Sequence, residues 1–408
     1  MGYTLDTAKG LGWIGTLRGA TRAVAFIRIA ILARILLPRE FGLFGIAALI
    51  LSFLEIFTET GINIFLIQLK EEIKEFIDTA WVVSIVRGAA MSLLILASAP
   101  FVSQFFGFQG IIPLLMLTAT VPLIRGFINP SIVKFQKNLE FNKEFWFRTS
   151  IYMIDALTVI IVALITKSAI SMVWGLVISS LAEVCLSFLF IKPIPKFSFE
   201  YDKIKQVINR GKWVTGFGVF DYLFQNIDDA IVGKILGAAS LGVYQVAYRI
   251  STLPVTEVAD VFYRVTFPIY VRISGDVNRL KKAFVKTLLT SGLFIFIIGL
   301  IVFMFPSEMV LIILGPNWLS AAQVLKMLAI YGILKGITGI MQSLFLAKEK
   351  QEYITFTTFI SLTVLVITIF PLLKIYGLIG VALSAVIGTT IGLILSTFLT
   401  LKILNNEN

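Results

Sequence analysis

The chain has 408 residues, of which 58% are hydrophobic and 14% charged, with a mean hydropathy of +0.92 and a formal net charge of +11. Soluble globular domains are nearer to about 45–50% apolar and about 25% charged, so this composition excludes a water-soluble enzyme. Histidine is absent and the single Cys185 lies in an apolar run, which argues against histidine acid–base chemistry, a zinc site or an intrachain disulfide, and we expect neither cofactor nor metal.

Apolar runs predict the helices of the chain. A membrane-spanning helix needs roughly 20 apolar residues, and charged or Gly/Pro breaks divide the sequence into about twelve such runs. Their expected bounds are 11–36, 41–67, 79–106, 110–133, 147–166, 169–191, 210–236, 241–271, 284–305, 320–346, 353–373 and 377–401. The run 11–36 is too long for a signal peptide and has no cleavage-site pattern. The sequence therefore predicts an all-α polytopic membrane protein.

Charges in the predicted loops indicate the orientation. With twelve spans both termini lie on one side, and most loop Lys and Arg residues fall there; the opposite side holds only Arg39, Lys167, Lys234 and Lys374. Basic loops stay on the cytoplasmic side, so we expect cytoplasmic termini and a place in the cytoplasmic (inner) cell membrane. The net positive charge then belongs to these loops and does not indicate nucleic-acid binding.

Short motifs recur about 200 residues apart. The matches are Arg34-Ile35-Leu36 and Phe41-Gly42-Leu43-Phe44 with Lys234-Ile235-Leu236 and Leu241-Gly242-Val243-Tyr244, then Gly107 with Gly315, and Arg125-Gly126 with Lys335-Gly336. They predict two six-helix lobes in parallel orientation, related by a pseudo-two-fold axis, with the substrate path between them. We expect the lobes at 1–191 and 210–408 and a cytoplasmic linker at 192–209. Chance similarity between Gly/Leu-rich helices is the alternative.

Several basic residues lie inside the predicted spans. One Arg or Lys at a helix centre costs about 2.5–3.5 kcal/mol on insertion scales, and no acidic residue shares the first span with its arginines. We expect these arginines to face a wet cavity suited to an anionic, phosphate-bearing substrate. The candidate binding residues are Arg18, Arg22, Arg28, Arg87, Arg125, Arg249 and Lys335. For Arg264, a structural pair with Asp260 or Glu257 of the same span is favoured.

Acidic residues within the spans equal the basic ones in number, so a net cationic cavity does not follow. The charges are segregated, however: the first, third and fourth spans are basic and the second, fifth, sixth and seventh are acidic. Two interpretations stay open, in which the charges pair between helices or the acids carry a proton or sodium ion that drives transport. The candidates for ion coupling are Asp155, Asp228, Glu55 and Glu59.

Prolines interrupt two of the predicted spans. Pro122 and Pro130 fall in the fourth, and Pro254 and Pro268 fall in the eighth. An interior proline removes a helix hydrogen bond and kinks the helix. We therefore predict hinges for rocking between inward-open and outward-open states, although a static kink gives the same pattern.

An ordered series of fragments along nearly the whole chain resembles Wzx-type polysaccharide flippases of the multidrug/oligosaccharidyl-lipid/polysaccharide exporter superfamily. The fragments include Leu32-Ala33-Arg34-Ile35-Leu36, Phe105-Phe106-Gly107, Gln136-Lys137-Asn138-Leu139-Glu140-Phe141, Asn226-Ile227-Asp228, Gly233-Lys234-Ile235-Leu236-Gly237-Ala238 and Gly315-Pro316-Asn317-Trp318. The resemblance implies a two-lobed helical fold and transfer of isoprenoid-diphosphate-linked oligosaccharides between leaflets, with Arg18, Arg22 and Arg28 on the diphosphate. Many relatives carry two further C-terminal helices.

Two other functions are weighed against this one. A drug or cation antiporter shares the fold, but its cationic substrate would need an acidic pocket near the first span, where three arginines lie. A membrane polymerase or glycosyltransferase would need a large outer loop or an acidic catalytic motif, and the outward connections are short. We therefore expect a transporter and no enzyme, whose partners are the glycolipid, the bilayer and a glycan polymerase or export system.

Overall fold

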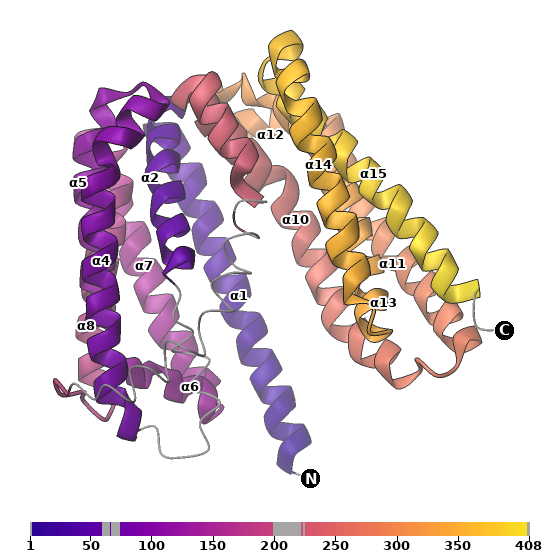
Figure 1. Ribbon diagram of the computed structural model, residues 1–408, viewed down its shortest axis with the longest axis horizontal. Helices are drawn as coiled ribbons and strands as arrows, with labels where there is room; N and C mark the ends of the chain where they lie inside the picture. Colours follow the sequence, from indigo (N-terminus) through magenta and orange to yellow (C-terminus); the bar gives the residue numbers. More distant parts are fainter. Residues whose placement is uncertain (1, 59–65, 67–73, 199–221, 223–224, 406–408) are drawn as a thin grey trace. The chain divides into compact units, whose positions relative to one another are not determined.

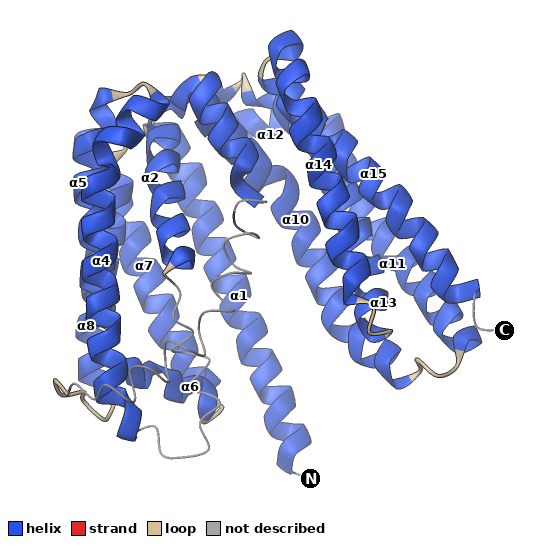
Figure 2. Cartoon of the chain, viewed as in Figure 1, coloured by secondary structure: helices blue, strands red, loops and turns tan. Residues whose placement is uncertain are grey.

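The computed structural model describes residues 2–58, 66, 74–198, 222 and 225–405, and every regular element in these ranges is a helix (Figure 2). The chain divides into two compact units, residues 1–239 (unit 1) and 240–408 (unit 2). Each unit has its own helical bundle. The predicted all-α fold is confirmed, while the predicted boundaries 191/192 and 209/210 between lobe and linker stay predictions.

The described part of unit 1 is a bundle of six long helices (Figure 1). They are α1 (Gly2–Ile35), α2 (Pro38–Phe57), α4 (Lys74–Phe106), α5 (Ile112–Gly126), α7 (Phe141–Thr166) and α8 (Ile170–Phe190), with η1 (Gln109–Ile111), η2 (Pro130–Val133) and α6 (Lys134–Lys137) between them. α4 lies against α5, α7 against α8, and α1 against α7. A helical stretch at 225–235 precedes unit 2.

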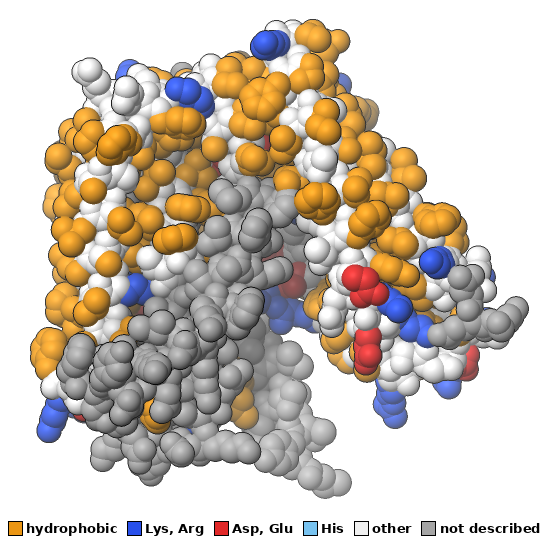
Figure 3. All heavy atoms as spheres, viewed as in Figure 1, with side chains coloured by type: hydrophobic (Ala, Val, Ile, Leu, Met, Phe, Trp, Pro, Cys, Tyr) orange, Lys and Arg blue, Asp and Glu red, His pale blue; other side chains and the backbone are white. Residues whose placement is uncertain are grey.

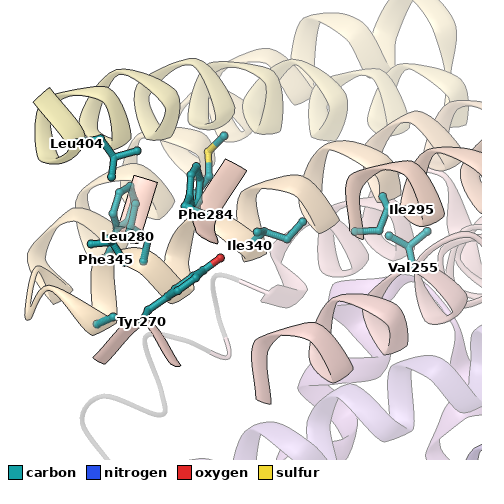
Figure 4. Close-up of a cluster of buried hydrophobic side chains, with 11 residues drawn as sticks. Val255, Tyr270, Leu280, Phe284, Ile295, Ile340, Phe345 and Leu404 are labelled. Carbon is teal, nitrogen blue, oxygen red and sulfur yellow. The ribbon is translucent and has the colours of Figure 1, made fainter. Parts of the chain in front are cut away.

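Unit 2 contains five long helices (Figure 1). They are α10 (Gly237–Arg272), α11 (Val277–Met304), α13 (Ala321–Ala347), α14 (Gln351–Tyr376) and α15 (Leu378–Asn405), with α12 (Pro306–Ile313) and η3 (Pro316–Trp318) between α11 and α13. A cluster of buried apolar side chains joins α10, α11, α13 and α15. Figure 4 shows Tyr270, Leu280, Phe284, Phe345 and Leu404 at one end of this cluster. Burial of these side chains stabilises the bundle from within.

Apolar side chains also cover the outside of the helices, as expected for contact with lipid. Phe101 on α4 is 73% exposed and Ile165 on α7 is 79% exposed. In unit 2, orange hydrophobic side chains cover the visible face of α14 and α15, and charged side chains gather near the α13–α14 connection (Figure 3). Since backbone polar groups in a bilayer must be satisfied within the segment, long apolar helices of this kind are membrane-spanning.

Nine helices among the described residues are long and apolar enough to cross a membrane. Three of the twelve predicted spans are not among them. The first and eighth fall in α1 and α10, which are long helices, 34 and 36 residues, but rich in charge. The seventh, 210–236, lies mostly outside the described residues. The chain is a multi-pass membrane protein.

The turns that join the helices repeat between the two units, which supports the predicted internal repeat. Positive backbone φ occurs at corresponding turns: Gly107 (φ 76°) and Gly315 (φ 95°), Leu139 (φ 59°) and Glu349 (φ 57°), Lys167 (φ 48°) and Gly377 (φ 57°). The third pair shares the sign of φ but not ψ, which is 36° at Lys167 and −131° at Gly377. The second and third pairs are both 210 residues apart. Their hydrogen bonds correspond as well, because Glu140 N donates to Phe135 O and Lys350 N donates to Phe345 O, each at 2.8 Å.

The structure corrects one of the predicted proline positions. Pro122 lies inside α5, and Pro254 and Pro268 lie inside α10. Pro130 is not in a helix interior, because α5 ends at Gly126 and Pro130 opens the short η2. The first position of a helix suits proline, since the N–H that proline lacks would have no partner there. Whether any of these prolines acts as a hinge stays a prediction.

Candidate functional site

A cavity of about 520 Å³ lies within unit 1, lined by α1, α2, α4, α5, α7 and α8. Its size falls in the range of small-ligand sites, roughly 300–1,000 Å³. The charged side chains that line it are Arg28, Arg87, Arg125, Arg148, Glu55, Asp155 and Glu183. Seven charged groups at one place in an otherwise apolar bundle mark this cavity as the candidate site, because intramembrane charges are expensive without a function or a partner.

Arg28 of α1 pairs with Asp155 of α7 at the cavity wall. Asp155 Oδ2 accepts a hydrogen bond from Arg28 Nη1, and the Asp155 side chain is only 9% exposed. Within the described part of the chain, the second carboxylate oxygen, Oδ1, is buried and has no hydrogen-bond partner. Arg28 thus lines the cavity, and it is paired there with a carboxylate of another helix, which is one of the two interpretations that the sequence left open. An unpaired ion buried at this place would cost roughly several kcal/mol. The ion pair avoids that cost for both side chains and therefore favours contact between α1 and α7.

Arg125 and Arg87 both converge on the last turn of α2. Arg125 Nη1 lies 2.7 Å from Glu55 Oε1, and Arg125 Nε donates to Ser180 Oγ of α8 at 3.2 Å. Arg87 donates to the main-chain oxygen of Glu55 at 2.6 Å and to Thr58 Oγ1 at 3.1 Å. The end of α2 is thus held by basic side chains from α4 and α5. The side chains of Arg125 and Glu55 each keep about a third of their surface exposed, so the pair borders open space.

Arg148 of α7 is a cavity residue that sequence reasoning missed. Its guanidinium lies 3.5 Å from Glu183 of α8 and 3.8 Å from Glu144 one turn earlier. Arg148 stands at the edge of the predicted fifth span, 147–166, and was read as a loop cation, whereas α7 begins at Phe141 and holds Arg148 about two turns inside the helix. The i,i+4 spacing of Glu144 and Arg148 was the available signal for the earlier helix start.

These pairs explain the segregation of charge between helices. Arg28 of α1 meets Asp155 of α7, and Arg125 of α5 meets Glu55 of α2, which agrees with the first of the two interpretations that the sequence left open, while ion coupling stays a prediction. The charges pair between helices, and they also line a polar cavity. Each carboxylate can be exchanged for another anion, because the guanidinium fork accepts a carboxylate or a phosphate in the same way.

Other predicted site residues lie elsewhere. Arg18 and Arg22 are exposed on α1 and are not among the residues that line the cavity. Asp228 is buried, also away from the cavity lining. Glu59 lies outside the described residues. The structure therefore groups Arg28, Arg87, Arg125, Glu55 and Asp155, and among the described candidates of unit 1 it does not bring Arg18, Arg22 or Asp228 to the cavity lining.

The two remaining basic candidates lie in unit 2. Arg249 is exposed on α10. Lys335 of α13 donates to Tyr248 Oη of α10 at 2.9 Å. The predicted structural pair of Arg264 is confirmed, with Arg264 Nε 3.0 Å from Asp260 Oδ2.

Solved structures share this fold. A structure of the lipid II flippase MurJ matches with a TM-score of 0.76 and 17% identity, covering 96% of this chain and 90% of that one. An inward-facing multidrug resistance MATE transporter of the MOP superfamily matches with a TM-score of 0.71 and 12% identity, covering 95% and 96%. The fold of this polytopic membrane protein is thus the one that MurJ and MATE transporters share.

The sequence itself shows the family. A family model described as polysaccharide biosynthesis protein matches residues 31–323, and the chain belongs to that family. Similar proteins include WzxC, a lipopolysaccharide biosynthesis protein of Escherichia coli K12 (24% identical, 97% of this chain and 81% of the relative), and TuaB, a teichuronic acid biosynthesis protein of Bacillus subtilis (24%, covering 86% and 73%). A membrane protein of the Klebsiella pneumoniae cps region is 26% identical over 98% of this chain and 84% of its own length. The resemblance to Wzx-type flippases is confirmed.

Proposed function

We propose that the chain is a flippase that moves isoprenoid-diphosphate-linked oligosaccharides from the cytoplasmic to the outer leaflet of the cell membrane for surface polysaccharide biosynthesis. The observation that carries this proposal is the arginine-lined cavity inside a membrane-embedded unit of a polysaccharide biosynthesis protein. Two similar proteins support transport of such a substrate. ExoT of Rhizobium meliloti is a succinoglycan biosynthesis transport protein, and MurJ is a lipid II flippase.

A diphosphate suits the chemistry of the cavity. Arg28 and Arg125 each hold a carboxylate, so an entering phosphate would exchange with a partner of the same charge and would not need an empty cationic pocket. At about 4 Å and an effective dielectric near 20, one such contact is worth roughly 4 kcal/mol before desolvation. Binding and release then require no covalent step, and the cycle is alternating access between two lobes. Arg18, Arg22 and Arg249 stay in this proposal as further contacts for the diphosphate or glycan.

A proton is the coupling ion that the site supports best. The Asp155 carboxylate has one oxygen on Arg28 and one buried oxygen without a hydrogen-bond partner among the described residues. Protonation would remove the charge that holds Arg28 and release the guanidinium to the substrate. The other charged groups of the same cavity are Arg87, Arg125, Arg148, Glu55 and Glu183, and they set the field in which this proton binds.

The setting of the flippase follows from the basic loops. Cytoplasmic termini would bring the α10–α11 connection, with Arg272 and Arg279, and the α13–α14 connection, with Lys348 and Lys350, to the cytoplasmic face, where anionic lipids favour them. Delivered glycolipid would pass to a glycan polymerase or export system on the outer side. The cell membrane is the place where such a carrier lipid is loaded and emptied.

Transport of a fluorescent lipid-linked oligosaccharide in proteoliposomes tests the proposal. We expect Arg28→Ala and Arg125→Ala to lower the initial rate at least tenfold. Arg264→Ala is the matched control, because its guanidinium pairs within its own helix, and it should keep at least half of the rate. Normal transport by the Arg28→Ala/Arg125→Ala double variant would reject the cavity as the binding site.

A cation antiporter is the competing function on this fold, since MATE transporters share it and the cavity also holds three acidic side chains. The same proteoliposomes separate the two. Uptake of a cationic dye that depends on Glu55 and Asp155, with no movement of the glycolipid, would establish the antiporter. New glycosidic bonds formed by the purified protein would instead indicate a polymerase or glycosyltransferase.

A further inference from the structure

Unit 2 contains a cationic cluster in which a lysine is surrounded by tyrosines. Tyr331 and Lys335 lie one turn apart on α13, and Tyr248 faces them from α10. Lys335 Nζ donates to Tyr248 Oη at 2.9 Å and lies 5.6 Å and 5.4 Å from the ring centroids of Tyr248 and Tyr331. The two tyrosine hydroxyls are 3.2 Å apart. All three side chains are only partly buried, so part of their surface remains accessible.

Close helix packing fixes the geometry of this cluster. A Cβ on Gly332 would lie 3.0 Å from the main-chain oxygen of Ser251, and a Cβ on Gly336 would lie 2.7 Å from a methyl carbon of Val255. These two glycines flank Lys335 on α13, and their contacts are on the turns of α10 that follow Tyr248. The helices can approach this closely only without side chains there. The ammonium is therefore held against the tyrosines by the backbone, and its position does not depend on a flexible loop.

The charge of Lys335 has no carboxylate partner among the described residues. This contrasts with Arg125, which occupies the corresponding place in unit 1, because the repeated turns place the two residues the same 210 positions apart. Arg125 reaches across to α2 and meets Glu55 at 2.7 Å, whereas Lys335 reaches across to α10 and meets a neutral phenol. Lys335 also lies next to the midpoint of the 27-residue α13, which is long and apolar enough to span a membrane, so we place it near mid-membrane. A cation at that depth is expensive unless an anion accompanies it.

We propose that Lys335, Tyr248 and Tyr331 form an oxyanion-binding site within unit 2, separate from the arginine cavity of unit 1. The ammonium has three N–H donors and uses one on Tyr248. One tyrosine hydroxyl donates to the other, which leaves a single O–H as a neutral donor beside the ammonium. This set of donors fits a phosphate or a carboxylate oxygen. In a glycolipid those oxyanions come from two sources, the diphosphate of the carrier or an acidic sugar of the glycan. The choice of these two anions rests on the proposed flippase function, but anion binding is measured without transport, so that either proposal can fail without the other.

Binding to the purified protein tests the site. The full chain is placed in nanodiscs of phosphatidylcholine, which carries no net charge, and titrated separately with inorganic diphosphate and with glucuronate by calorimetry. Lys335→Met removes the ammonium and keeps the length of the side chain. Lys326→Met is the matched control on the same helix, because Lys326 lies over the Phe303 ring at 4.8 Å, away from the tyrosines. Tyr331→Phe removes only one hydroxyl.

We expect Lys335→Met to weaken one of the two anions at least tenfold and Tyr331→Phe to weaken the same anion about threefold, with Lys326→Met unchanged. The two effects should be non-additive in the double variant, since both groups would bind one oxyanion. Loss of diphosphate binding would show that the site takes the diphosphate of the carrier lipid, and loss of glucuronate binding would show that it takes an acidic sugar of the glycan. Equal effects of the Lys326 and Lys335 substitutions, or no effect of Lys335→Met on either anion, would overturn the site. If Lys335→Met fails to fold, two other variants decide. Lys335→Arg keeps the charge and should keep anion binding, whereas Tyr331→Phe should weaken it about threefold.

Discussion

Gly88 of α4 and Gly126 of α5 meet where these two helices cross beside the charged cavity. A Cβ added to Gly88 would lie 3.2 Å from Gly126 Cα and would collide with the main-chain oxygen of Pro122. A Cβ added to Gly126 would lie 2.9 Å from Ser84 O and 3.1 Å from Ile85 Cα. Both positions line the cavity. The width of the cavity on this side therefore depends on two residues that have no side chain.

We predict that Gly88→Ala and Gly126→Ala each lower the free energy of unfolding by about 1–3 kcal/mol, because the atoms in the way belong to the backbone and cannot turn aside. Thermal unfolding of the purified protein in detergent measures this effect. Gly339→Ala on α13 is the control, since nothing lies within 4 Å of its added Cβ. An equal loss of stability in all three variants would show that the α4–α5 crossing tolerates a methyl group.

Substitutions of Arg28 and Asp155 separate the structural role of the pair from its role in transport. Arg28→Met leaves a buried carboxylate without its partner, and we expect a loss of about 3–5 kcal/mol. The double variant Arg28→Met/Asp155→Leu removes both charges and should recover most of that stability. A double-mutant cycle of unfolding free energies measures the coupling.

Transport by the same double variant gives the decisive contrast. If Arg28 contacts the diphosphate, the stable double variant still fails to move the glycolipid. Recovery of both stability and transport would mean that Arg28 only holds α1 against α7. Comparable amounts of each variant in the membrane must be verified first, since a destabilised protein lowers the rate by its abundance alone.

Glu40 at the start of α2 caps a distant helix. Its Oε2 atom accepts a hydrogen bond from Ala169 N at 2.7 Å, at the N-terminal end of α8. A carboxylate there satisfies a free N–H group and interacts favourably with the helix dipole. We expect Glu40→Ala to lower the unfolding free energy by about 1 kcal/mol. Glu40→Gln keeps an acceptor oxygen and should lose less; the opposite ranking in thermal unfolding would contradict the cap.

Asn129 ties the connection after α5 to the chain that follows α8. Its Nδ2 group donates to Ile191 O at 3.2 Å and Pro193 O at 3.1 Å, and its Oδ1 atom accepts from Ser131 N at 3.0 Å. Asn129 is fully buried, so losing the donors leaves carbonyls unsatisfied at about 1–3 kcal/mol.

We therefore predict that Asn129→Asp, which keeps the shape and removes the amide donors, destabilises unit 1 and exposes residues 191–198 to protease. Limited proteolysis in detergent, with cleavage sites identified by mass spectrometry, measures the exposure. Ser131→Ala removes one hydrogen bond to the same Pro193 oxygen and should increase cleavage less. Unchanged cleavage in Asn129→Asp would show that the tether is not needed.

Hydropathy and spacing were sufficient for most of the fold. The apolar runs predicted helices where the structure has them, and the spacing of short motifs predicted a repeat that the turns at Leu139 and Glu349 bear out. The start of α7 was misplaced because Arg148 was read as a loop charge, although a helix can begin with several polar residues at the membrane surface. Charge content explains why α1 and α10 are long helices without being apolar enough to count as spans on hydropathy.

The site was less predictable, because contacts between helices depend on how each helix is rotated about its axis. The sequence identified Arg28 and Asp155 as charges within different helices, but it could not show that these two side chains contact each other. The same limit separated Arg18 from Arg28, which share a helix but not the cavity. Neither hydropathy nor motif spacing could show that Lys335 meets tyrosines, because Tyr248 is 87 positions away.

The repeated turns of the two units have a consequence for the origin of the chain. Corners with positive φ at nearly the same separation indicate duplication of a half-length ancestor. After duplication the corners persisted, while the group opposite the buried cation became a glutamate in one half and a phenol in the other. Divergence of the halves has thus changed the partner of this cation, whereas positive φ at the corners has been kept.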